Sequence, residues 1–176
     1  MVSEAVTPLN LLLLVLVCLL VWFFIRQAKE WKRQKQVVSE ERAGILGQPV
    51  PPDIGRDIQG AAKGGFDSEE LSPLSYLGYR VGKINGLSPE ARRRRLRVCL
   101  SMEMPTILPA KYRRWGRPVT YQRYASLFNH LLMLANQRRG RSNYQFAVAD
   151  WESDAQWLKG EFEPLAIKLK RFGFQR

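Results

Sequence analysis

Arginine is concentrated at three places in this chain, with other cations or aromatic residues close by. Four consecutive arginines occupy 92–95, a run of cations and aromatics occupies 111–117, and a third cluster occupies 138–141. Arginine and lysine neutralise phosphates, and aromatic rings stack on unpaired bases. These residue types predict a basic face that binds nucleic acid or an acidic protein. The candidate residues are Arg92, Arg93, Arg94, Arg95, Arg97, Lys111, Arg113, Arg114, Trp115, Arg117, Arg138, Arg139 and Arg141.

Two of these clusters also have a structural interpretation. Four consecutive helical residues sweep about 300° of the helix surface, so at least one arginine of 92–95 must pack its stem along the core. The run 111–117 suits phosphate contact and base stacking, but it equally suits a cation–π clasp inside the domain, and packing is the favoured interpretation. No base-reading motif is present, so we expect no sequence-specific readout.

Residues that could perform catalysis or hold a metal are scarce. His130 is the only histidine, and the two cysteines, Cys18 and Cys99, lie in an apolar run and in a basic helix. No nucleophile, base and orienting residue can be assembled from these types. We therefore expect that this protein is not an enzyme and that it holds no metal and no cofactor.

Three carboxylates, Asp150, Glu152 and Asp154, stand close together in the sequence. Such a group can suggest a metal site. On a helix, however, Glu152 points away from the other two, and nearby arginines can pair with all three. Salt bridges are therefore the favoured interpretation.

The positive charge of the chain is concentrated in one stretch. The formal net charge is +12 at pH 7 over 176 residues. Residues 71–140 contain 14 lysines and arginines against 2 aspartates and glutamates, so this stretch alone matches the charge of the whole protein. Charge that served only solubility would be distributed over the surface, whereas focused charge indicates a polyanionic partner.

Residues 5–25 carry no charge and predict a single transmembrane helix. At about 1.5 Å per residue such a helix spans the ~30 Å hydrocarbon core. Glu4 precedes the run and Arg26 follows it, unlike the flanks of a cleaved signal peptide. The alternative is a buried core helix. In the transmembrane interpretation, residues 5–25 contact membrane lipid.

The flanking charges predict the orientation of this helix. Residues 26–35 contain five lysines and arginines against one glutamate, while residues 1–4 contain neither lysine nor arginine. The positive-inside rule then places the C-terminal domain in the cytoplasm. We expect the helix to continue to about Arg42, where its cations can also attract anionic lipid.

Residues 44–70 interrupt the helical pattern. They contain six glycines, three prolines, two cations and five carboxylates. We expect a flexible acidic linker here, between a membrane segment at 1–43 and a basic helical domain at 71–176.

The domain is predicted to be helical. Ser72 and Ser88 each offer an N-cap before a proline, which predicts a short helix that Gly78 ends and a longer one from Pro89 to about Met102. Residues 79–84 could be a strand or an ordered loop, and the loop is favoured. The expected fold class is mainly α, with a single N-terminal transmembrane helix, a flexible Gly/Pro-rich linker and a small helical C-terminal domain.

Two further helices follow from the spacing of apolar residues. A helix over about 121–138 carries a buried stripe at three- and four-residue intervals. Residues 142–145 have the form of a capping box and open a helix whose stripe extends to Phe162. After Pro164, a short basic amphipathic tail at 165–172 can dock on the core or touch lipid.

Residues 73–83, with 86–88 and 91–93 after them, resemble a module of uncharacterised bacterial proteins. Residues 149–152 and 157–159 fit the C-terminal part of that module, so the resemblance covers residues 73–162. It implies a bacterial chain and a genuine domain. It carries over no activity and no catalytic residue.

Two functions are compatible with these patterns. In the first, a single-pass protein of the bacterial inner membrane binds nucleic acid non-specifically through its cytoplasmic basic domain, with an affinity that falls steeply with salt. In the alternative, the protein is an adaptor or subunit of a membrane complex. Its basic face then binds an acidic protein, and its helix can pack against other membrane subunits.

Overall fold

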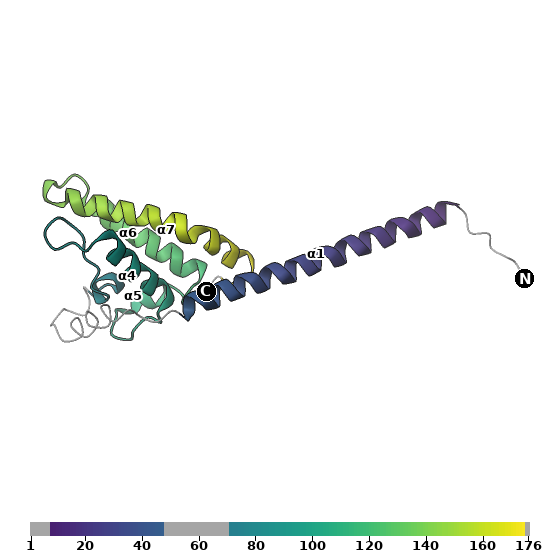
Figure 1. Cartoon of the computed structure of the whole chain (residues 1–176), viewed down its shortest axis with the longest axis horizontal. Helices are drawn as coiled ribbons and strands as arrows, with labels where there is room; N and C mark the ends of the chain where they lie inside the picture. Colours follow the sequence, from purple (N-terminus) through teal and green to yellow (C-terminus); the bar gives the residue numbers. More distant parts are fainter. Residues whose placement is uncertain (1–7, 48–70, 175–176) are drawn as a thin grey trace, which may run out of the picture. The chain divides into compact units, whose positions relative to one another are not determined.

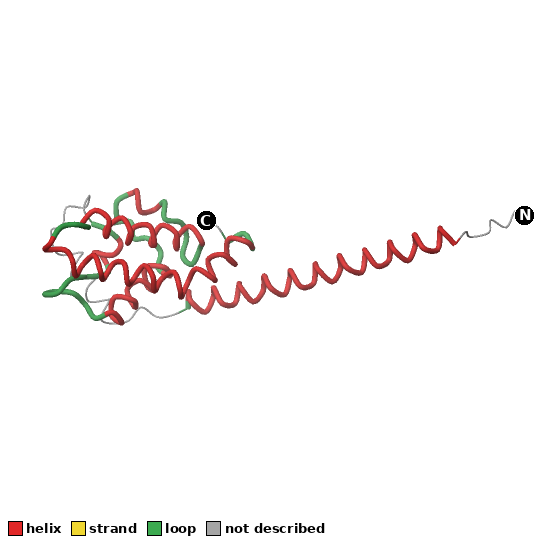
Figure 2. The backbone as a smooth tube through the Cα atoms, turned by 90° about the horizontal axis from the view of Figure 1, so that it is seen from above, coloured by secondary structure: helices red, strands yellow, loops and turns green. Residues whose placement is uncertain are grey.

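The computed structural model describes residues 8–47 and 71–174, and these residues are mainly helical with no strand (Figures 1 and 2). The expected mainly α class is therefore confirmed. The chain divides into two compact units, residues 1–40 and residues 41–176.

The first unit contains most of one long helix, α1 (Pro8–Leu46). Along this helix the large apolar side chains between Leu13 and Ile25 are exposed, among them Trp22 at 58% and Phe24 at 68%. Among the described residues, no helix combines the length and the apolar character that a bilayer crossing demands.

Helix α1 extends further than predicted. Gly44 and Ile45, which we expected in the linker, belong to the last turn of α1. This turn is held in the second unit, because Arg42 donates hydrogen bonds to the carbonyl oxygens of Val119 (3.1 Å) and Pro118 (3.2 Å). Residues 48–70, which contain all five carboxylates of the predicted linker, lie outside the described residues.

The second unit is a bundle built on two long helices. α6 and α7 are joined by a short turn and pack along each other, and α4 packs against both (Figure 1). α3 packs against α4. The helices of this unit are α3 (Pro73–Tyr76), α4 (Pro89–Ser101), α5 (Ala110–Arg113), α6 (Tyr121–Arg138), the 3-10 helix η1 (Ser142–Tyr144) and α7 (Gln145–Arg171).

The two predicted serine–proline helix starts are confirmed. Ser72 and Ser88 accept hydrogen bonds from backbone N–H groups of α3 and α4, and Ser72 forms a full capping box with Ser75. Gly78 ends the α3 turn with a φ of 66°, a conformation that glycine adopts without steric cost. Residues 79–84 form a loop, as favoured.

Two boundaries around α7 differ from the prediction. No side-chain cap forms at residues 142–145; a 3-10 turn precedes α7 instead. Pro164 does not separate a C-terminal tail, because α7 continues through it to Arg171. An interior proline costs a helix about 3 kcal/mol. Burial of Leu165, Ala166 and Leu169 on the bundle offsets that cost.

Leucines from α4, α6 and α7 form the centre of the core. Leu96, Leu127, Leu131 and Leu158 are fully buried, and Cys99 lies among them. The predicted apolar stripe of α6 is confirmed by the burial of its Leu127 and Leu131.

A buried ion pair connects α4 to α7. The Arg92 Nε donates to Asp154 Oδ2 at 2.7 Å, and its Nη2 lies 3.1 Å from Asp150 Oδ1. The Tyr79 hydroxyl also donates to Asp154 (2.7 Å), and the Gly82 N–H donates to Asp150 (2.9 Å). These contacts confirm that the carboxylates form salt bridges, and they fix the 79–87 loop against α7.

A second buried arginine, Arg123, has no carboxylate partner among the described residues. It is 1% exposed and donates to the carbonyl oxygens of Cys99, Met102 and Gly116 at distances from 2.6 to 3.1 Å. Two of these carbonyls lie at the C-terminal end of α4, where a cation is favourably placed. Arg123 therefore joins α6 to the end of α4 and to the segment after α5.

Removing one partner of the buried pair should destabilise the second unit strongly. Asp154→Ala leaves the buried Arg92 with Asp150 as its one remaining carboxylate partner among the described residues and also removes the acceptor of the Tyr79 hydroxyl, so we expect the free energy of unfolding to fall by about 3 kcal/mol. Urea unfolding of the full chain in detergent, followed by tryptophan fluorescence, measures this.

The matched control is Glu161→Ala, which breaks the exposed pair of Arg97 and Glu161 (3.0 Å). An exposed pair contributes less than about 1 kcal/mol, so this variant should remain close to the wild type. Equal losses in the two variants would contradict the proposed importance of burial.

Candidate nucleic-acid interface

The basic segment, residues 111–117, buries its two aromatic side chains and exposes its cations. Tyr112 and Trp115 turn inward and pack edge to face, with ring centroids 5.3 Å apart. Gly116 adopts a φ of 89°, and its carbonyl oxygen accepts two hydrogen bonds from Arg123. These hydrogen bonds connect the backbone of the segment to the buried Arg123.

The cations of the basic segment are exposed, and the side chains of three of them have no partner among the described residues. Lys111, Arg113, Arg114 and Arg117 all lie at the surface. Lys111 rests 5.2 Å from the centroid of the Tyr112 ring. The side chains of Arg113, Arg114 and Arg117 form no ion pair or hydrogen bond with any described residue. An anionic partner could bind them without breaking a hydrogen bond or ion pair between described residues.

Trp115 does not serve as the predicted stacking surface. It is only 9% exposed and packs against Tyr112 and His130, 5.2 Å from the imidazole centroid. The structural interpretation of the aromatics in this segment is therefore correct. The cations around them remain candidates for binding.

Arg92 and Arg95 must be removed from the predicted surface. Arg92 is 3% exposed and paired with carboxylates; Arg95 is 4% exposed and donates to the carbonyl oxygens of Leu77 (3.0 Å) and Ala91 (3.1 Å). The reason is geometric: a helix that packs on two neighbours cannot expose four consecutive residues. The expectation that at least one of these arginines packs inward is confirmed, and two of them do.

Two of the other arginines of α4, Arg93 and Arg97, interact with side chains of α7. The guanidinium carbons of Arg93 and Arg97 lie 5.6 Å and 5.2 Å from the centroid of the Trp157 ring. Arg97 also pairs with Glu161. Arg94 is the arginine of this helix that is exposed and forms no contact with any described residue.

The third cluster surrounds the turn between α6 and α7. Arg138 lies 4.8 Å from the centroid of the Tyr144 ring, Arg139 pairs with Glu152, and Arg141 is exposed. Together the three arginines line a hollow of about 230 Å³ at the start of α7. We call this the arginine hollow; its other lining residues are Gly140, Gln145, Val148, Ala149 and Glu152.

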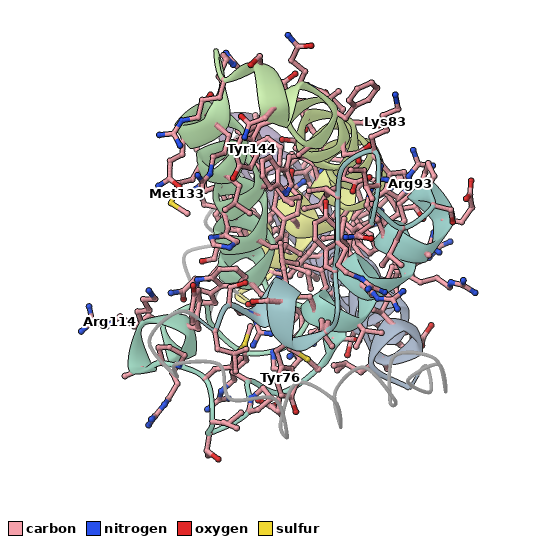
Figure 3. The ribbon with its side chains drawn as sticks, turned by 90° about the vertical axis from the view of Figure 1, so that its left-hand side faces the viewer. Tyr76, Lys83, Arg93, Arg114, Met133 and Tyr144 are labelled. Carbon is pink, nitrogen blue, oxygen red and sulfur yellow. The ribbon has the colours of Figure 1, made fainter. Side chains whose placement is uncertain are left out.

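The predicted basic residues do not form one continuous face. Figure 3 places Arg93 and Arg114 on opposite sides of the domain, with Tyr144 of the α6–α7 turn at its upper end. The structure therefore separates the cations into three groups: the arginines of α4, those of the basic segment and those of the arginine hollow. Of these, the basic segment has the most exposed cations whose side chains lack a partner among the described residues.

The sequence interpretation missed two residues near these surfaces. Arg123 was not singled out, although it supports the basic segment from inside; a cation within an apolar stripe could have signalled it. Phe146 was also missed, although it is 59% exposed at the start of α7. Its place outside the predicted stripe of that helix was the available signal.

Burial shifts the pKa of two potentially reactive side chains in this unit, Cys99 and His130. Burial raises the pKa of the Cys99 thiol to about 12, so it is protonated at neutral pH. Burial, together with the nearby Lys111, lowers the pKa of His130 to about 4, so the imidazole is neutral. In the part of the chain that the structure describes, no three histidine, cysteine or acidic residues gather as metal ligands.

Comparison with family models, curated proteins and solved structures gives no match to this chain. The resemblance of residues 73–162 to a bacterial module therefore stays a prediction.

The buried histidine should make stability depend on pH. With a pKa near 4 in the folded state and 6.5 in the unfolded state, only the unfolded chain binds the proton between these values. The free energy of unfolding should therefore fall, by about 2 kcal/mol, as the pH drops from 6.5 toward 4.

Comparison of the wild type with His130→Phe isolates this effect, because carboxylate titration is common to both chains. The difference in their unfolding free energies should change between pH 7 and pH 4.5. Parallel pH profiles would show that His130 titrates normally in the folded protein.

Proposed function

We propose that this chain is a membrane-anchored protein whose basic domain binds nucleic acid non-specifically. One observation carries the proposal: Arg113, Arg114 and Arg117 are exposed, free of partners among the described residues, and held on a fixed backbone. Cations that already point into solvent can neutralise phosphates and release counterions without first breaking a hydrogen bond or ion pair with a described residue.

The membrane anchor is the second part of the proposal. The uncharged run at residues 5–25 supports it, as do the exposed apolar side chains of α1 from Leu13 onward. A helix that is apolar on all sides must be shielded from water, and the lipid bilayer can provide that environment. The five cations at residues 26–35 support a cytoplasmic position for the basic domain.

Non-specific binding follows from the chemistry of the free side chains. They offer guanidinium groups to phosphate oxygens, and none of the described helices carries a known base-reading pattern. The domain would therefore hold DNA or RNA at the membrane surface through the negative charge of the nucleic acid's phosphate backbone.

Removing cations from the basic segment should weaken binding and its salt dependence together. For Arg113→Gln/Arg114→Gln in the full chain in detergent, we expect the slope of log K against log salt to fall by about 1.8 with duplex DNA. Fluorescence polarisation over a salt series measures both the affinity and the slope.

The matched control, Arg94→Gln/Lys159→Gln, removes the same charge from exposed positions on α4 and α7. It should change the slope much less. Equal changes in the two variants would mean that the total charge matters and the basic segment does not. No binding by the wild type, together with a stably co-purified acidic protein, would overturn the proposal.

The anchor makes a separate prediction. The full chain should remain in the membrane pellet after alkaline carbonate extraction, whereas a chain lacking residues 8–25 should be released, because it has lost its uncharged run. Immunoblotting of the two fractions measures this, and release of the full chain would contradict the anchor.

A further inference from the structure

An exposed aromatic ring stands at the start of α7. Phe146, the second residue of this helix, is 59% exposed, whereas its neighbour Ala147 is buried. The ammonium group of Lys83, on the 79–87 loop, lies 5.5 Å from the centroid of the Phe146 ring. The ring is therefore flanked by a cation and accessible to solvent.

The arginine hollow includes residues from the same end of α7. Gln145, which precedes Phe146, and Ala149, which lies three residues after it, both line the hollow, whereas the Phe146 ring does not line it. Residues three apart on a helix are surface neighbours, so the hollow and the ring occupy adjacent faces of the start of α7. Figure 3 shows Lys83 and Tyr144 both in the upper part of the domain, apart from each other, and Arg114 of the basic segment lower down.

The hollow itself favours an anion. Three arginines line it against one glutamate, and that glutamate already pairs with Arg139. Arg141 has no partner among the described residues. Guanidinium groups bind phosphate oxygens through paired hydrogen bonds, so a phosphate fits this lining.

A phosphate site beside an exposed ring matches one class of partner best. Single-stranded nucleic acid offers phosphates and unstacked bases at adjacent positions, and aromatic side chains stack on such bases. A duplex keeps its bases stacked inside, so the ring would contribute little. An acidic peptide would use the arginines but would have no need of the ring.

We propose that the Phe146 ring and the arginine hollow together bind single-stranded nucleic acid, with a base on the ring and a neighbouring phosphate in the hollow. This inference rests on the proposed function and adds a strand preference to it. The basic segment then supplies affinity for either form, while this end of the domain distinguishes them.

The test compares a labelled oligothymidylate with a labelled duplex of equal length, using the full chain in detergent and fluorescence polarisation. Phe146→Ala should weaken single-strand binding about fivefold or more, the effect of losing one stacked base. Duplex binding should stay within about twofold. Phe146→Trp should keep or strengthen single-strand binding, whereas Phe146→Leu should resemble the alanine variant.

Ile167→Ala is the matched control, because Ile167 is 57% exposed on the same helix but lies near its other end. It should leave both affinities unchanged. If single-strand and duplex binding survive Phe146→Ala, or fall equally, the strand preference is wrong while the proposed function stands. If the wild type binds neither probe at low salt, or binds only an acidic protein, both proposals are overturned.

Discussion

Burial of arginine is the constraint on which the second unit depends. A guanidinium removed from water must find a partner for its charge and its N–H groups, or the fold loses several kcal/mol. Arg92 meets this demand through Asp154 and Asp150, and Arg123 meets it through three backbone carbonyls. Because these partners come from different elements, satisfying the arginines also fixes how α4, α6, α7 and their connecting loops fit together.

The same constraint divides the positive charge into internal and external parts. Arginines whose positions on α4 face the bundle are neutralised there, and those facing Trp157 are held by cation–π contact. Exposed cations whose side chains have no partner among the described residues remain at Arg94 of α4, in the basic segment and at Arg141 in the α6–α7 turn. Arg123 connects the two roles, since its bonds to Gly116 hold the backbone from which the free arginines project.

Local signals in the sequence were sufficient for most helices. The serine–proline pairs at 72 and 88 specify helix starts, and Gly78 specifies a helix end, because these effects act within one turn. The stripe of α6 and the salt bridging of Asp150, Glu152 and Asp154 also followed from spacing and charge. The α7 boundaries did not, since burial on neighbouring helices overrides proline.

The sequence by itself determined that the domain is helical, that its positive charge is concentrated in residues 71–140, and that the aromatics of the basic segment suit packing. Only the tertiary structure decided which cations lack a partner among the described residues. Arg92 and Arg94 are identical in type and two residues apart, yet one is buried against Asp154 and the other is exposed. That difference depends on which elements pack on each side of α4, and contacts between residues some sixty positions apart leave no local signal in the chain.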